Sequence, residues 1–114
     1  MKISEIVKIL DGTVMTGENR LEENNDYVFA TDLMSEVLTL GDKNPIILSG
    51  LCNMQTIRTC EMGNLDILII VRGKKPTDDM MELAEENGMV VIACGYSMFK
   101  ACGLLYQNGL KPLY

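Results

Sequence analysis

The sequence predicts an α/β fold with three layers: a mainly parallel central sheet that is covered by helices on both faces. Three short apolar runs, rich in Ile and Val and without polar alternation, have the pattern of strands that are buried on both faces. Each run leads into a glycine-containing polar loop, and a helix-like stretch follows. These runs are 46–48, 67–71 and 90–93. Because crossovers between parallel strands are right-handed, the repeated plan predicts βαβ winding with these strands at the centre of the sheet.

A first helix and two further strands are predicted ahead of the central runs. Ser4 is expected to cap the helix, whose apolar side comes from residues 6–10. Short strands are expected at 13–16 and 27–30, with a polar, acidic loop at 21–26 between them. The order of these two strands in the sheet is left open by the sequence.

Four more helices are predicted, and three of them have a side chain that can cap the first turn. The expected caps, in chain order, are Thr31 or Asp32, Asn53 and Thr77, and the last helix is expected to begin near Ser97. Glycines end these helices, and residues 110–114 follow the last one as a short tail. In the predicted helix 33–40, apolar spacing predicts that Leu33, Val37 and Leu40 face inward. In the predicted helix 54–62, the inward residues are expected to be Met54, Ile57 and either Cys60 or Met62.

Composition and charge narrow the class of protein. A chain of 114 residues with 47% hydrophobic content fits one domain spanning 1–114. The net charge of −6 argues against a nucleic-acid partner, which requires a basic surface. The apolar runs are too short to span a membrane, and the first ten residues carry charges that a signal peptide would lack. The sequence therefore predicts a cytoplasmic protein whose four cysteines are reduced.

The candidate site lies where the predicted parallel strands end. Open α/β sheets bind ligands at the carboxyl ends of their strands, where helix N-termini and glycine loops favour anions. Three of the ten basic residues fall between Arg72 and Lys75. The candidate ligand-binding residues are Thr31, Asp32, Ser49, Gly50, Asn53, Arg72, Gly73, Lys74, Gly95 and Ser97. The chemistry predicted for them is capture of a small anion, such as a nucleotide or a phosphorylated metabolite.

Other interpretations of these residues stay open. The glycines and lysines can be ordinary loop residues, because neither Gly-x-x-x-x-Gly-Lys-Ser/Thr nor Gly-x-Gly-x-x-Gly occurs. The chain has no histidine and no Cys-x-x-Cys pair, so no catalytic triad, metal site or particular cofactor is predicted. Cys52 and Cys94 each precede a helix start, a position that can lower the pKa of a thiol and make it reactive. Cys60 and Cys102 are expected to be buried packing residues.

Several stretches carry a resemblance to a known family. They are Ala30–Leu38, Ile46–Gly50, Leu68–Gly73 with Pro76, Glu82–Gly88 and Tyr96–Ser97. Over about Tyr27–Leu110 the chain resembles the DRTGG domain, which is similar in fold to the N-terminal domain of HPr kinase. Such domains also occur beside CBS domains in some pyrophosphatases, and in some phosphotransacetylases, where other domains carry the chemistry. The resemblance implies a stand-alone regulatory or ligand-sensing module, often dimeric and not itself catalytic.

One loop departs from this family pattern. Family members often have Gly-Asp-Arg after the central strand, whereas this chain has Gly50-Leu51-Cys52 and so loses an acid and a base there. A ligand contact through that acid or that base is therefore not expected at this loop. Free-standing copies occur in anaerobic bacteria, some encoded near hydrogenase-type redox genes, which implies a redox-linked protein partner.

Three functional hypotheses follow from the sequence. The first is a non-catalytic regulatory domain that binds a partner protein or a small anion. The second is a redox sensor or small enzyme that uses Cys52 or Cys94, and the third is a purely structural dimerisation module. A homodimer is expected, because Met80 with Met81 and the tail residues Leu110, Leu113 and Tyr114 suggest more apolar surface than one small core can hide.

Overall fold

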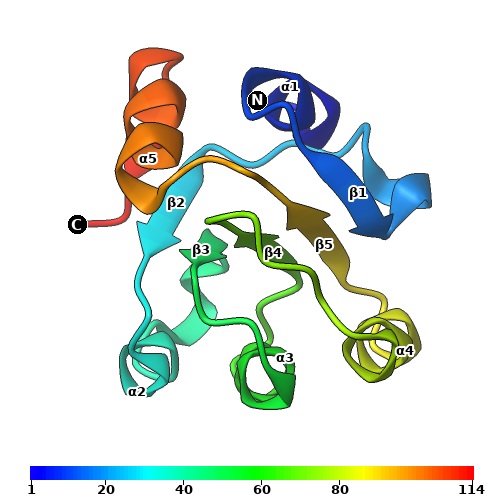
Figure 1. The fold of residues 1–114 in the computed structure, drawn as a ribbon. Coiled ribbons are helices and arrows are strands. Elements are labelled where there is room, and N and C mark those ends of the chain that lie inside the picture. The colour runs from blue at the N-terminus through cyan, green and yellow to red at the C-terminus, as the bar shows by residue number, and fades with distance from the viewer.

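The computed structural model describes all 114 residues and contains a six-stranded sheet between two layers of helices (Figure 1). The strands are β1 (Thr13–Thr16), β2 (Tyr27–Ala30), β3 (Ile46–Ser49), β4 (Ile67–Ile70), β5 (Val90–Ala93) and β6 (Lys111–Pro112). Their order is β1-β5-β4-β3-β2-β6, with β1 antiparallel to β5 and every other pair parallel. The predicted α/β class is confirmed, and the three apolar runs form the central strands.

Helices cover both faces of the sheet, as predicted (Figure 1). The helices α1 (Ile3–Ile9) and α5 (Met98–Gln107) lie on one face. The other face carries α2 (Met34–Val37), α3 (Met54–Met62) and α4 (Asp78–Glu86). Two short 3₁₀ turns, Glu18–Arg20 and Gly41–Lys43, lie in the connections. None of these helices combines the length and the apolar character needed to cross a membrane.

The core is divided into two halves by the alternation of side chains along the strands. Every residue of β3 and β4 is buried. Ile46 and Leu48 pack on the side of α1 and α5, whereas Ile47 packs on the side of α2, α3 and α4. Because successive side chains of a strand point to opposite faces, a strand that is apolar throughout must be covered on both sides. This requirement accounts for the three-layer architecture.

The predicted helix caps Asn53 and Thr77 are confirmed, and Ser97, near which the last helix is predicted to begin, also caps its helix. The side chains of Asn53, Thr77 and Ser97 accept the backbone N–H three residues ahead, at the starts of α3, α4 and α5. Each bond satisfies an N–H group that has no partner within its helix.

The first predicted cap is wrong. Ser4 lies inside α1, and the residue before the helix, Lys2, makes no side-chain capping bond. The loop before β2 performs this role, because the N–H groups of Ile3 and Ser4 donate to the carbonyl oxygens of Glu23 and Leu21. A long-range contact thus replaces the local cap.

Helix 33–40 is also shorter than predicted, and Leu33 does not face inward. The Thr31 hydroxyl accepts the N–H of Leu33 at 3.0 Å, which holds Leu33 in an extended conformation and delays the helix until Met34. Leu33 is consequently 58% exposed, while Val37 and Leu40 are buried as expected. On α3 the inward residue is Cys60, and Met62 is 70% exposed.

The tail is partly a strand rather than an irregular end. Its residues Lys111 and Pro112 pair with β2, and the N–H of Lys111 donates to the carbonyl of Asp26. This pairing buries Leu110, so the expectation that Leu110 adds exposed apolar surface is wrong. Met80 is buried and Met81 packs partly against the same half of the core. Of the side chains expected to add exposed apolar surface, Tyr114 does so, since it is 75% exposed.

Truncating a central side chain should test the two-sided core. Ile69→Ala in β4 removes a fully buried side chain, and we expect it to lower the free energy of unfolding by about 2–5 kcal/mol. The matched control Met62→Ala removes a mostly exposed side chain and should change that energy by less than about 0.5 kcal/mol. Urea unfolding followed by circular dichroism measures both. Equal effects of the two substitutions would contradict the assigned core.

Candidate functional site

The carboxyl ends of four parallel strands bring polar loops together at one edge of the sheet. These loops follow β2, β3, β4 and β5, the strands at which ligands bind in open α/β sheets. Of the residues predicted for the site, Asp32, Ser49, Gly50 and Arg72 are joined by direct contacts. The site is therefore assembled from residues far apart in the sequence.

Asp32 is the centre of this arrangement. One carboxylate oxygen accepts the N–H of Gly50 at 2.7 Å and the hydroxyl of Ser49 at 3.0 Å. The pKa of Asp32 lies below its ordinary value of 3.8, chiefly because of the Gly50 N–H, with smaller contributions from Ser49 and the nearby charges of Arg72 and Lys74. An internal carboxylate thus occupies the backbone N–H that the sequence suggested for an external anion.

Arg72 lies against the loop after β3. Its Nη2 donates to the carbonyl of Gly50 at 3.1 Å and lies 3.5 Å from the second oxygen of Asp32. A Cβ at position 50 would collide with the guanidinium, so only glycine permits this close approach. The Arg72 side chain is 48% exposed. A guanidinium has five N–H donors, and most of those here are free to bind a further acceptor.

The backbone of Arg72 is held in an unusual conformation. Its φ of 68° lies in the left-handed region, which costs a residue other than glycine about 1–2 kcal/mol, and Gly73 follows with a φ of 70°. Two bonds to the loop after β5 maintain this turn: Arg72 N–H donates to the carbonyl of Tyr96 at 2.7 Å, and Gly73 N–H donates to that of Cys94 at 3.0 Å. These bonds hold the backbone from which the Arg72 side chain reaches the Gly50 carbonyl.

Two lysines add positive charge near this edge. Lys74 is close enough to act electrostatically on both Asp32 and Cys52. Lys100, in the first turn of α5, places its Nζ 3.9 Å from the ring centroid of Tyr96. Sequence reasoning missed Lys100 and its contact with the Tyr96 ring, although the spacing of four residues is the local signal for such a pair.

The other predicted site residues have local structural roles. Asn53 and Ser97 cap their helices, and the Thr31 hydroxyl donates to Glu36 at 2.6 Å while accepting the N–H of Leu33. Gly95 borders open space, since a Cβ there would meet no atom within 4 Å. Most of the predicted site residues therefore shape the loops at this edge. Arg72 and Lys74 differ from them, because they bring positive charges that a ligand can contact.

The surroundings of Cys52 and Cys94 are not those expected of a reactive thiol. Cys52 is half-buried, and burial raises its pKa above the ordinary value of 9.0, with Lys74 opposing the shift. Cys94 is buried, and its thiol donates to the carbonyl of Leu10 at 3.4 Å. Of the remaining cysteines, Cys60 is buried as predicted and has a pKa raised to about 12, whereas Cys102 is only half-buried.

Comparison with known proteins places this fold in a family. The DRTGG domain model matches residues 5–107, and the chain belongs to the DRTGG domain family. This match confirms the resemblance inferred from the sequence. A search of curated proteins gave no match.

A solved structure has a similar fold. It is the crystal structure of the CBS and DRTGG domains of the regulatory region of Clostridium perfringens pyrophosphatase, complexed with the activator diadenosine tetraphosphate. The superposition has a TM-score of 0.74 at 20% sequence identity and covers 96% of this chain and 47% of that one. This chain therefore spans about half the length of that regulatory region.

The contacts of Asp32 predict a pH-dependent contribution to stability. Asp32→Ala should lower the free energy of unfolding by about 1 kcal/mol at pH 7, a modest value because the carboxylate is 46% exposed. Since the pKa in the folded state is below 3.8, the stabilisation is complete above pH 3.8 and is lost as the pH falls through the folded pKa. Urea unfolding between pH 7 and pH 2 measures the difference.

Asp42→Ala provides a control, because Asp42 is an exposed carboxylate in the turn Gly41–Lys43. We expect it to have little effect at any pH. A carboxyl carbon titration by NMR that placed the pKa of Asp32 at or above 3.8 would contradict the contacts described.

The raised pKa of Cys52 predicts a slow thiol. At pH 7.5 its alkylation by iodoacetamide should be slower than that of free cysteine, because less thiolate is present. Mass spectrometry of digested protein assigns the rates, and the Cys52→Ser variant confirms the assignment. A rate above that of free cysteine would favour the redox hypothesis.

Proposed function

We propose that this chain is a non-catalytic regulatory domain that binds a small anionic ligand at the carboxyl-terminal edge of its sheet. The observation that carries the proposal is the Arg72 side chain, which is positioned by the Gly50 carbonyl, half exposed, and accompanied by Lys74. In a chain of net charge −6, a fixed guanidinium with free donors favours a phosphate or carboxylate ligand.

The internal carboxylate suggests how such a ligand would be received. Asp32 partly neutralises Arg72, with 3.5 Å between the nearest oxygen and nitrogen. An incoming anion would compete with Asp32 for the guanidinium, while the Gly50 N–H keeps Asp32 bound to its loop. A ligand with several negative charges would gain most, because it can engage Arg72 and Lys74 together.

The similar regulatory region supports a ligand of this kind. It is described in complex with the activator diadenosine tetraphosphate, whose four phosphates form a polyanion. At 20% identity the likeness extends to the fold, so the charged edge of this chain remains the main support for an anion.

The titratable groups at this edge also favour binding over catalysis. The pKa of Asp32 is lowered and that of Cys52 is raised, so both shifts move away from neutrality. General acid–base catalysis works best with a pKa near the working pH. We therefore propose no catalytic residue. A cytoplasmic location and a homodimer are further parts of the proposal.

A thermal-shift assay tests the anion site. Diadenosine tetraphosphate, ATP and inorganic triphosphate should each raise the melting temperature of the wild-type protein, because binding to the folded state stabilises it by mass action. The double variant Arg72→Ala, Lys74→Ala should abolish this shift. The control Lys8→Ala, Lys111→Ala removes the same charge from other elements and should retain the shift.

A second variant separates position from charge. Gly50→Ala keeps every charged residue but displaces the guanidinium of Arg72, so it should weaken the shift in the same direction. A shift that survives the Arg72 and Lys74 substitutions would place the ligand elsewhere. If no anion shifts the wild-type melting temperature, the anion proposal is wrong.

A further inference from the structure

The outer side of α5 carries an apolar stripe that its own chain does not cover. Phe99 is 90% exposed and Tyr106 is 71% exposed, whereas Ala101 and Leu105 on the inner side are buried. Cys102 and Gly103 lie between the two aromatic residues, which completes the i, i+3, i+4, i+7 spacing of one helix face. Phe99 has the highest exposure among the large apolar side chains.

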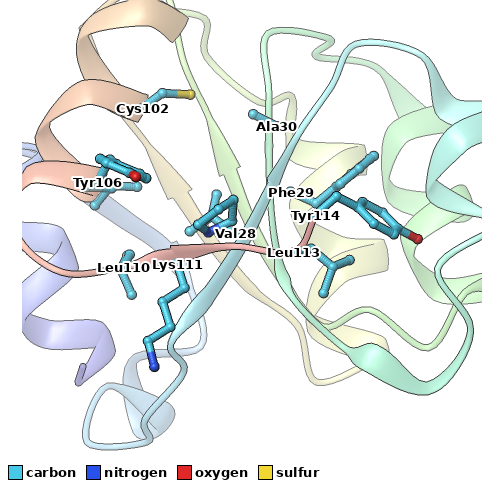
Figure 2. Close-up of a pocket in the computed structure, with 11 residues that line it drawn as sticks. Val28, Phe29, Ala30, Cys102, Tyr106, Leu110, Lys111, Leu113 and Tyr114 are labelled. Carbon is cyan, nitrogen blue, oxygen red and sulfur yellow. The ribbon is translucent and has the colours of Figure 1, made fainter.

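This stripe continues into a groove at the edge of the sheet. A cavity of about 250 Å³ is lined by α5, β2 and the tail, and Figure 2 shows Cys102 and Tyr106 on one side of it with Leu113 and Tyr114 on the other. Because Cys102 and Tyr106 belong to both the stripe and the groove, the two form one apolar surface. We call this surface the α5 face. An exposed patch of this kind usually marks a contact.

The charge of the chain is distributed so that the α5 face has no acidic residue. All 16 Asp and Glu residues lie at or before Glu86, so α5, β6 and the tail contain none. Over most of its surface, a second copy of this acidic chain would be repelled. The segment that forms the α5 face lacks the acidic side chains that cause this repulsion, and its only charged side chains are Lys100 and Lys111.

The spacing of the stripe is also self-complementary. Phe99 lies three residues before Cys102, and Tyr106 lies three residues after Gly103. If two α5 helices cross antiparallel about a twofold axis near Cys102 and Gly103, Phe99 of each copy meets Tyr106 of the other. The small residues then meet at the axis, where they permit helices to approach to about 8 Å. In this arrangement an aromatic pair, a favourable contact, forms on each side of the axis.

We propose that the α5 face binds the α5 face of a second copy, forming a twofold dimer through antiparallel α5 helices. This inference rests on the homodimer of the proposed function and assigns its surface. A stable interface buries about 800 Å² on each partner. The four residues of the stripe cannot supply this area by themselves, so the groove beside β6 contributes the remainder. Phe99 and Tyr106 are the anchors of the contact, consistent with the weight that aromatic residues carry in interfaces.

Light scattering on size-exclusion chromatography tests the surface. The wild-type protein should have twice the chain mass at micromolar concentration. Phe99→Ser should raise the dimer Kd at least about tenfold, because it removes one anchor from each copy. Gly103→Leu should give the monomer mass, since a Cβ at position 103 meets no atom of its own chain within 4 Å, whereas the leucine side chain would block the helix crossing. The control Met62→Ser removes a similarly exposed apolar side chain from α3 and should leave the dimer unchanged.

Thiol cross-linking gives an independent measurement. With the axis near residues 102 and 103, a short bis-maleimide should link Cys102 of the two copies. Cys102→Ser should abolish the cross-linked dimer, while Cys52→Ser, which removes the other half-buried thiol, should not.

The results of these experiments distinguish failure of the α5 face from failure of the homodimer or of the anion site. A wild-type monomer would overturn both the homodimer and this interface, and it would leave the anion site to the thermal-shift assay. A wild-type dimer that Phe99→Ser and Gly103→Leu leave intact would overturn the α5 face while the homodimer stands. A dimer lost in both variants, with Cys102 cross-linking, supports the interface.

Discussion

The fold depends on the burial of β3 and β4 on both of their faces. Each residue of these strands is apolar or small and inaccessible, and their side chains alternate between the two halves of the core. No single layer of helices can cover such a sheet, so the chain must cross from one face to the other between strands. This requirement directs the loops to the two ends of the strands, and it places the polar residues of the candidate site at the carboxyl-terminal edge.

At that edge the loops are joined to one another before any ligand binds. Asp32 connects the loop after β2 to the loop after β3, and the N–H groups of Arg72 and Gly73 connect the loop after β4 to the loop after β5. The left-handed turn at Arg72 is compensated by these bonds. A ligand that competes with Asp32 for Arg72 would therefore act on loops that are already in mutual contact.

The candidate site and the α5 face meet at the start of α5. Tyr96 accepts the N–H of Arg72, Ser97 caps the helix, and Lys100 lies over the Tyr96 ring. The stripe of the α5 face begins at Phe99, within the same turn. A regulatory domain needs a bound ligand to change a contact with another molecule. Direct contacts therefore join the loop that carries Arg72 to the first turn of α5.

The sequence by itself determined the central strands, their helices and the family. Continuous apolar runs such as Ile67–Val71, glycine stops and the caps Asn53 and Thr77 are local signals, because each depends on neighbours within a few residues. The same signals predicted that polar residues would meet at one edge of the sheet. They also indicated Arg72 and Lys74 as its basic members.

Only the tertiary structure decided the features that depend on distant contacts. The start of α1 is set by the carbonyls of Leu21 and Glu23 rather than by Ser4, and β6 forms only because β2 offers a free edge. Two further features also depend on how distant segments pack. Asp32 accepts the N–H of Gly50, and Phe99 is left exposed. A hydrogen bond between residues far apart in the chain, or the burial of a helix face, depends on how the elements pack in space. That packing is not encoded in any single stretch of the sequence.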